Sequence, residues 1–151
     1  GIQTCALPIW GPIGEVRKKL SIPVIANGDI WRIEDFRACR DQTGCEHFML
    51  GRSALANPHL SHSIAKELGL GGRNLSAAPS REEWKALIER FLEISSGFSS
   101  NPFYALKRVK QWLRFAHLHG NFFGFDTIKR LEHENDVLAW LKTDPQKAAT
   151  I

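Results

Sequence analysis

The chain has 151 residues, of which 43% are hydrophobic, 10% aromatic and 24% charged, a balance typical of a folded globular protein. No apolar run approaches the ~20 residues that span a bilayer, and there is no charged-then-apolar leader, so we expect a cytoplasmic protein that does not insert into membranes. The three cysteines, Cys5, Cys39 and Cys45, are too irregularly spaced for a disulfide framework or a zinc site. The net charge of +4 names no partner by itself.

The first part of the chain alternates between helical and extended patterns. Residues 1–9 show neither a period nor a cap, and we interpret them as a non-native or disordered start. A helical spacing over residues 12–19 is followed by the β-branched run 22–26, which predicts a buried strand. A helix over residues 34–43 and a second buried strand over 46–50 repeat the pattern. This alternation predicts parallel strands joined by right-handed crossovers.

A short helix at residues 53–56 and a longer one that runs to Leu68 follow the second strand. Asn57 is a good N-cap, and Pro58 suits the first helical position. The segment 69–79 is rich in glycine, proline and serine. It predicts a linker between a domain of residues 10–68 and a second domain of residues 80–151.

The second domain has helical patterns only. Ser80 and Glu83 form a capping box before an amphipathic helix, and Asn101-Pro102 starts another helix that ends at Gly120. Its inward positions are Leu106, Val109, Leu113 and Ala116. Two further helices are predicted over residues 126–134 and 136–142. The sequence therefore predicts an α/β part followed by an all-α bundle.

Both predicted strands end at a glycine turn, Asn27-Gly28-Asp29 after the first and Gly51-Arg52 after the second. In consecutive parallel units the two turns emerge at the same edge, where glycine lets a ligand approach the backbone. A phosphate fits such an edge, with Arg52 as its countercharge and the short helix at 53–56 beside it. The alternative is that each glycine serves only its own strand-to-helix turn.

Two segments resemble the tRNA-dihydrouridine synthases in order and spacing: residues 22–31, IPVIANGDIW, and residues 49–58, MLGRSALANP. Arg108-Val-Lys-Gln-Trp112 is similar to the subfamily C enzymes, which act on uridine 16. The resemblance extends over about residues 10–141. It implies the last two βα units of a (β/α)8 TIM barrel that holds FMN, followed by a helical tRNA-binding domain, with NADPH as the hydride source. The chain would then be a C-terminal piece of such an enzyme, because a whole barrel needs ~250 residues.

The resemblance also implies roles for individual residues. Asn27, Gly28, Asp29, Gly51 and Arg52 match positions that bind FMN, the last two its phosphate. The tRNA contacts fall on Arg108, Lys110, Phe115 and Lys129, and Phe115 stands where the subfamily often has tyrosine. The family's catalytic cysteine lies on a mid-barrel loop outside this chain, so no cysteine here is assigned a catalytic role.

The charge pattern agrees with an RNA partner without proving one. Between Asn101 and Arg130 six lysines and arginines are opposed only by Asp126. Lys107, Arg108, Lys110, Arg114 and Phe115 avoid the apolar stripe of their helix, which gives a basic face with an aromatic residue in it. The alternative is a solvated helix face that complements the helix dipole.

Two other functions remain open from the residues alone. The helical half can act as a stand-alone RNA-binding module without flavin, or the glycine turns can belong to a different flavin- or phosphate-binding barrel. Four of the six histidines, His59, His62, His117 and His119, could be considered as ligands, but they have no recognised metal spacing, so no metal site is predicted.

Overall fold

The computed structural model describes residues 9–101 and 103–143. The chain forms two compact units, and the boundary between them falls between Ala77 and Ala78, inside the segment 69–79. Of the predicted non-native start, residues 1–8 lie outside the described residues, and Ile9 is exposed.

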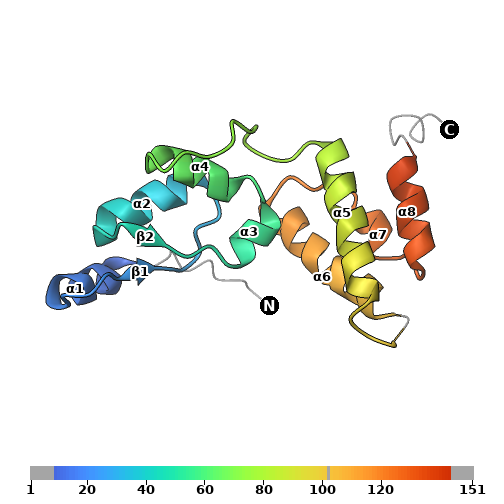
Figure 1. Ribbon diagram of the computed structural model, residues 1–151, viewed down its shortest axis with the longest axis horizontal. Coiled ribbons are helices and arrows are strands. Elements are labelled where there is room, and N and C mark those ends of the chain that lie inside the picture. Colours follow the sequence, from blue (N-terminus) through green and yellow to red (C-terminus); the bar gives the residue numbers. More distant parts are fainter. Residues whose placement is uncertain (1–8, 102, 144–151) are drawn as a thin grey trace. The chain divides into compact units, whose positions relative to one another are not determined.

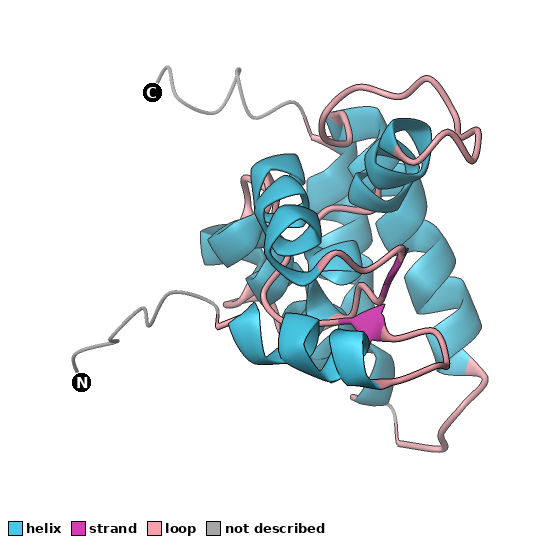
Figure 2. Cartoon of the chain, turned by 90° about the vertical axis from the view of Figure 1, so that its left-hand side faces the viewer, coloured by secondary structure: helices cyan, strands magenta, loops and turns pink. Residues whose placement is uncertain are grey.

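The first unit alternates helices with two short strands (Figure 1). Its elements in chain order are α1 (Gly11–Lys19), β1 (Ile25–Ala26), α2 (Ile33–Thr43), β2 (His47–Phe48), α3 (Arg52–Ala56) and α4 (Leu60–Glu67). The strands are parallel neighbours, with Ile25 opposite His47 and Ala26 opposite Phe48. Figure 2 shows how small this sheet is beside the helices. The predicted alternation and the parallel pairing are both present.

Both strands are shorter than the sequence predicts. The runs 22–26 and 46–50 were expected to be extended throughout, but each strand is reduced to two residues. Within the described part of the chain each strand pairs with one neighbour, and Pro23 has no N–H to give to a ladder. One further hydrogen bond, from the Met49 N–H to the Ala26 carbonyl (2.9 Å), continues the pairing toward the two glycine turns.

The core of the first unit lies between the strands and the helices. Phe36 and Cys39 on α2 pack with Ala26 of β1 and with residues of α4, and all of these are buried. At Gly14 on α1, an added Cβ would stand 2.9 Å from the Gln42 carbonyl oxygen, so glycine allows α1 to lie close against α2. This packing fixes α2, whose preceding loop carries the predicted flavin residues Asn27, Gly28 and Asp29.

The second unit is helical throughout the described residues. It contains α5 (Arg81–Ser96), α6 (Tyr104–His119), α7 (Phe125–Ile128) and α8 (Glu134–Lys142). The capping box at the start of α5 is confirmed, because the Ser80 hydroxyl accepts the Glu83 N–H (3.2 Å) and the Glu83 carboxylate accepts the Ser80 N–H (2.7 Å).

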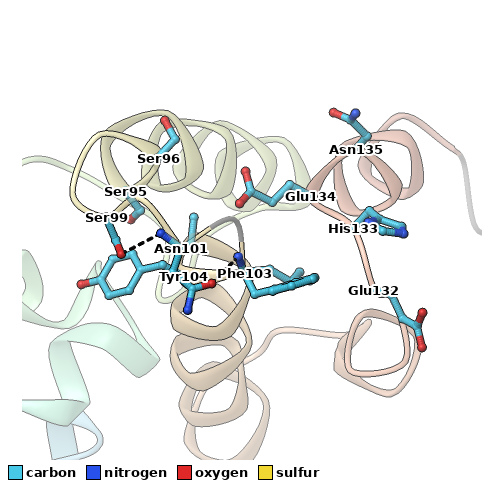
Figure 3. A pocket seen from close by; sticks show the side chains of 12 residues that line it. Ser95, Ser96, Ser99, Asn101, Phe103, Tyr104, Glu132, His133, Glu134 and Asn135 are labelled. Carbon is cyan, nitrogen blue, oxygen red and sulfur yellow. Dashed lines mark hydrogen bonds between the residues drawn. The ribbon is translucent and has the colours of Figure 1, made fainter.

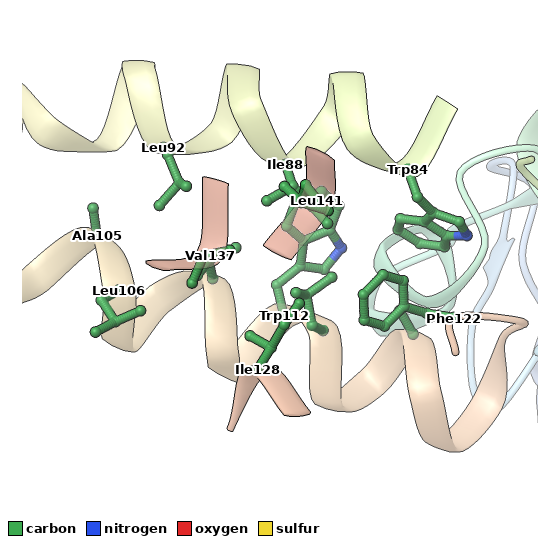
Figure 4. Packing of buried hydrophobic residues seen from close by; sticks show 13 residues of the cluster. Trp84, Ile88, Leu92, Ala105, Leu106, Trp112, Phe122, Ile128, Val137 and Leu141 are labelled. Carbon is green, nitrogen blue, oxygen red and sulfur yellow. The ribbon is translucent and has the colours of Figure 1, made fainter. Parts of the chain in front are cut away.

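One apolar cluster holds the second unit together. Figure 4 shows it along the facing sides of α5 and α6, from Trp84 and Phe122 at one end to Leu92 and Leu106 at the other. The four residues predicted to face inward on α6 are buried. Burying such side chains contributes roughly 1.5–3 kcal/mol each relative to exposure, so the cluster is the main source of stability in this unit.

Four predicted helix bounds differ from the structure, those of α7, α8, α4 and α6. The helix expected over 126–134 is only the single turn α7, and α8 begins at Glu134, because the chain between them turns and presents carbonyl groups to Lys110. α4 starts at Leu60, since the Asn57 side chain accepts the His59 N–H (3.0 Å) before the helix. α6 starts at Tyr104, and Pro102 lies outside the described residues. No helix of residues 9–101 and 103–143 has the length and apolarity to cross a bilayer.

Candidate functional site

The two glycine turns of the first unit meet at one cavity of about 270 Å³. All five residues that the family resemblance implies for flavin binding line it, together with four others. The nine lining residues are Asn27, Gly28, Asp29, Ile30, Trp31, Met49, Gly51, Arg52 and Ser53. The turns therefore lie at the same edge of the β1–β2 sheet, as the parallel arrangement requires.

The first turn has a backbone that favours glycine and is held from behind. Gly28 has φ +129° and Asp29 φ +46°, both in the left-handed region where a side chain is rarely accommodated. The indole N–H of Trp10 donates to the Gly28 carbonyl at 2.7 Å. This bond ties the turn to the core of the first unit, to which Trp10 belongs.

The second turn, at Gly51, leaves room for a ligand. An added Cβ on Gly51 would meet nothing within 4 Å, and Gly51 lines the cavity. The next residue, Arg52, begins α3 and places one guanidinium nitrogen 3.4 Å from the Asp29 carboxylate. The two turns are thus linked by an ion pair across the cavity mouth.

The charges at the mouth define what the cavity can hold. Arg52 has five N–H donors and uses one on Asp29, so others remain for an anion such as a phosphate. The Asp29 carboxylate accepts hydrogen bonds and repels a second anion, so it suits the hydroxyl groups of a ligand better than its phosphate. The cavity is therefore suited to a molecule that has an anionic end and a hydroxylated part.

Sequence reasoning assigned no role to Trp31 and Met49 at this cavity. The Trp31 ring faces the Arg52 guanidinium, whose central carbon lies 5.6 Å from the ring centroid. Met49 accepts a weak hydrogen bond from the Asn27 amide at 3.6 Å. The signal for both was proximity, since Trp31 and Met49 each stand two residues from a predicted flavin residue.

The predicted tRNA contacts lie in the second unit and differ in how accessible they are. Arg108 is exposed on α6, where its guanidinium donates to Gln111 (2.8 Å) and lies 6.0 Å from the Tyr104 ring centroid. Phe115 is half-buried on the same helix. Lys129 directly follows α7 and pairs with Asp126, whose pKa this lysine lowers through a hydrogen bond and its charge.

Lys110 does not face outward as the helical spacing predicted. It is half-buried, and its ammonium group donates to the carbonyl oxygens of Lys129 (3.1 Å) and Leu131. The reason is that the chain after α7 passes over this position of α6 and presents the carbonyl groups of Lys129 and Leu131 there. Lys107, Arg108 and Arg114 remain as the exposed cations of α6.

A second cavity, of about 550 Å³, lies in the helical unit between the end of α5, the start of α6 and the start of α8. Figure 3 shows Glu134 reaching toward the side formed by Ser95 and Ser96, while Glu132 points away. Two carboxylates and several hydroxyl and amide groups line it, and it contains no lysine or arginine. It is therefore a poor site for phosphate, in contrast to the cavity at Arg52.

The described residues offer no metal site, and no thiol lines the cavity at Arg52. No three histidine, cysteine, aspartate or glutamate side chains in them gather to hold an ion. Cys39 and Cys45 are both buried in the core of the first unit, and Cys5 lies outside the described residues. Burial, with a smaller effect of Cys45, raises the pKa of Cys39 to about 11.

Comparison with known proteins places the chain in a family. The family model described as dihydrouridine synthase matches residues 6–149, so this chain belongs to the dihydrouridine synthase family. Among curated relatives, the tRNA-dihydrouridine(16) synthase of Haemophilus influenzae is 38% identical over 130 residues, which are 85% of this chain and 39% of the relative.

Other relatives carry the same name. The tRNA-dihydrouridine(16) synthase of Neisseria meningitidis is 30% identical over 86% of this chain and 40% of its own length. That of Escherichia coli is 33% identical over 70% of this chain and 31% of its own length. The chain therefore spans between about a third and two fifths of the relatives that it matches.

Proposed function

We propose that this chain supplies the flavin-phosphate site and the tRNA-binding helices of a tRNA-dihydrouridine synthase that acts on uridine 16. The observation that carries the proposal is the single cavity shared by the two glycine turns, with Arg52 at its mouth. Family membership supports the activity, and the name of the relatives supports the choice of uridine 16.

The residues at the cavity fit the phosphate end of FMN. The open space at Gly51 lets a ligand approach the backbone, and Arg52 supplies charge for the phosphate. Asn27 and Asp29 add polar groups suited to the hydroxylated chain of the cofactor. FMN reduced by NADPH would supply hydride for the C5–C6 double bond of uridine. The part of this chain is to bind and orient the cofactor, and the proton donor belongs to a part of the enzyme outside these residues.

The flavin proposal is tested by equilibrium binding of FMN to this chain and to Arg52→Ala. Losing charge-assisted hydrogen bonds to phosphate costs about 1.5–3 kcal/mol, so we expect binding to weaken by about tenfold or more. Arg73→Ala is the matched control, because Arg73 is an exposed arginine of the same unit away from the cavity. Equal affinity of Arg52→Ala and the unmodified chain would refute the phosphate assignment.

The second unit is proposed to bind the tRNA through the exposed cations of α6, chiefly Arg108, and through Lys129. The stand-alone RNA-binding module remains the competing function, and it predicts tRNA binding with no FMN binding.

Filter binding of tRNA at several salt concentrations tests the proposed RNA surface. Each phosphate contact contributes roughly 0.7–0.9 to the slope of log K against log salt, so Arg108→Ala should reduce the slope by about that amount. Arg90→Ala, an exposed arginine on α5, should leave the slope unchanged.

A further inference from the structure

The anion site depends on the side chain of Arg52, which the ion pair with Asp29 restrains only weakly. The Arg52 side chain is 64% exposed, and its ion pair with Asp29 is also largely exposed. An exposed arginine has many rotamers, and an exposed ion pair of this kind contributes little. A further contact is therefore needed if Arg52 is to stay at the cavity mouth before a ligand arrives.

Trp31 provides that contact. Its ring centroid lies 5.6 Å from the central carbon of the Arg52 guanidinium, within the range of a cation–π interaction. Because this attraction acts through the face of the ring, it consumes no N–H donor of the arginine. One N–H goes to Asp29, and the others remain for an anion.

The position of Trp31 is itself fixed by the start of α2. The Asp35 carboxylate, in the first turn of that helix, accepts the backbone N–H groups of both Trp31 (3.0 Å) and Arg32 (2.9 Å). The Trp31 ring is half-buried and lines the cavity. A rigid helix start therefore holds the ring against which Arg52 rests.

We propose that Trp31 is a positioning residue for the anion site, and that its ring holds the Arg52 guanidinium at the mouth of the cavity. The inference rests on the proposed function, because the anion is taken to be the phosphate of FMN. Trp31 acts on the ligand only through Arg52.

A double-mutant cycle with FMN as the probe tests the proposal. A cation–π pair at an exposed site contributes about 0.5–1 kcal/mol, so Trp31→Leu should weaken FMN binding roughly two- to fivefold. Trp31→Phe, which keeps a ring, should retain most of the affinity. In an Arg52→Ala background Trp31→Leu should have no further effect, because the residue that Trp31 holds is gone.

The control is a similar pair in the other unit. The central carbon of the Arg81 guanidinium lies 5.3 Å from the Trp140 ring centroid, and neither residue lines the cavity at Arg52. Trp140→Leu should leave FMN affinity unchanged. A loss of affinity on Trp31→Leu that is as large in the Arg52→Ala background would overturn the proposal, because it would mean that the ring acts on the ligand directly or on the fold.

A measurement without ligand separates this inference from the flavin assignment. Protons of the Arg52 side chain near the Trp31 ring should be shifted upfield by the ring current, and Trp31→Leu should remove the shift. If neither FMN nor inorganic phosphate binds but the upfield shift is present, the proposed function fails while the Trp31–Arg52 contact stands. If Arg52 resonates at the position of a free arginine in the unmodified chain, the inference fails whatever binds.

Discussion

Among the described residues, Cys39 has the largest shift of its pKa. Burial penalises the thiolate and raises the pKa of Cys39 from 9.0 to about 11, the nearby Cys45 adds to the effect, and a hydrogen bond with Thr43 opposes it. The thiol is thus neutral and buried at neutral pH. This is the state of a structural cysteine and not of a reactive one.

The raised pKa of Cys39 makes the stability of the first unit sensitive to alkali. Its contribution to the free energy of unfolding is complete below about pH 9 and is lost as the pH rises from about 9 to about 11, because the unfolded thiol ionises first. We expect the loss to be about 1–3 kcal/mol. Urea unfolding at pH 8 and pH 10.5 measures it against Cys39→Ala, whose stability should fall less over this range. Parallel losses in both proteins would contradict the assignment.

Position 124 requires glycine because of its backbone conformation and because the Trp140 ring lies against it. It has φ +146° at the start of α7, and an added Cβ would overlap the indole ring of Trp140. Gly124→Ala should therefore lower the free energy of unfolding of the second unit by about 2–4 kcal/mol. Chemical denaturation checks this, with Gly11→Ala as the control, since a Cβ at Gly11 meets nothing within 4 Å. A change below about 0.5 kcal/mol would show that Trp140 moves aside.

At the scale of elements, Lys110 joins α6 to the chain that follows α7. Its ammonium group donates to two carbonyl oxygens there, and hydrogen bonds from charged groups contribute about 1.5–3 kcal/mol. Lys110→Met, which keeps the aliphatic stem, should destabilise the second unit by about 1–3 kcal/mol in urea denaturation. Lys107→Met, on the exposed side of α6, is the control.

The same variant decides between two roles of Lys110. If Lys110 contacts tRNA directly, as the family resemblance implies, Lys110→Met should leave the stability unchanged and reduce the salt slope of tRNA binding by roughly 0.7–0.9. If Lys110 instead holds the chain after α7 through its two carbonyl contacts, Lys110→Met should lower the free energy of unfolding. The salt slope of tRNA binding should then change little, apart from the effect of any movement of Lys129.

Most elements could be predicted from local sequence, and their ends could not. The capping box at Ser80 fixes one helix start because both partners lie within the same turn. The length of the strand at Ile25 depends instead on how many neighbours it has, and the end of α7 depends on Lys110, nineteen residues before Lys129 in the chain. Such effects are tertiary and leave no local pattern.

At the candidate site, too, some features could be predicted from the sequence and others depend on tertiary contacts. Parallel βα units put Gly28 and Gly51 at one edge by topology alone, so their meeting could be predicted from the alternation of elements. The ion pair between Asp29 and Arg52 and the ring of Trp31 beneath the guanidinium depend on side-chain directions. These directions could not be read from spacing.

At the scale of the whole molecule, the first unit exposes apolar side chains around its small sheet. Ile25 is 62% exposed on β1, which has one hydrogen-bonded neighbour among the described residues, and Ile22, three residues earlier, is 66% exposed. Open strand edges and exposed apolar residues promote association between copies. We expect this chain to self-associate as its concentration rises.

Sedimentation velocity at increasing concentration tests the association. The double variant Ile22→Thr, Ile25→Thr keeps β-branched residues and lowers the apolar area, so it should shift the equilibrium toward the monomer. Phe98→Ser, which removes a 73% exposed apolar residue from the second unit, is the control and should change association less. A concentration-independent monomer would contradict the expectation.

The glycine-rich segment between the units is tied down along much of its course. Asn57 donates to the Ala77 carbonyl (2.8 Å), His59 donates to the Ser76 carbonyl (3.0 Å), and Lys66 donates to Asn74 (3.1 Å). On the other side, the Pro79 carbonyl accepts a hydrogen bond from Asn121 (3.0 Å). The peptide bond after Ala77 falls at the boundary between the units and severs none of these anchors, so a protein engineer can separate or exchange the two halves there.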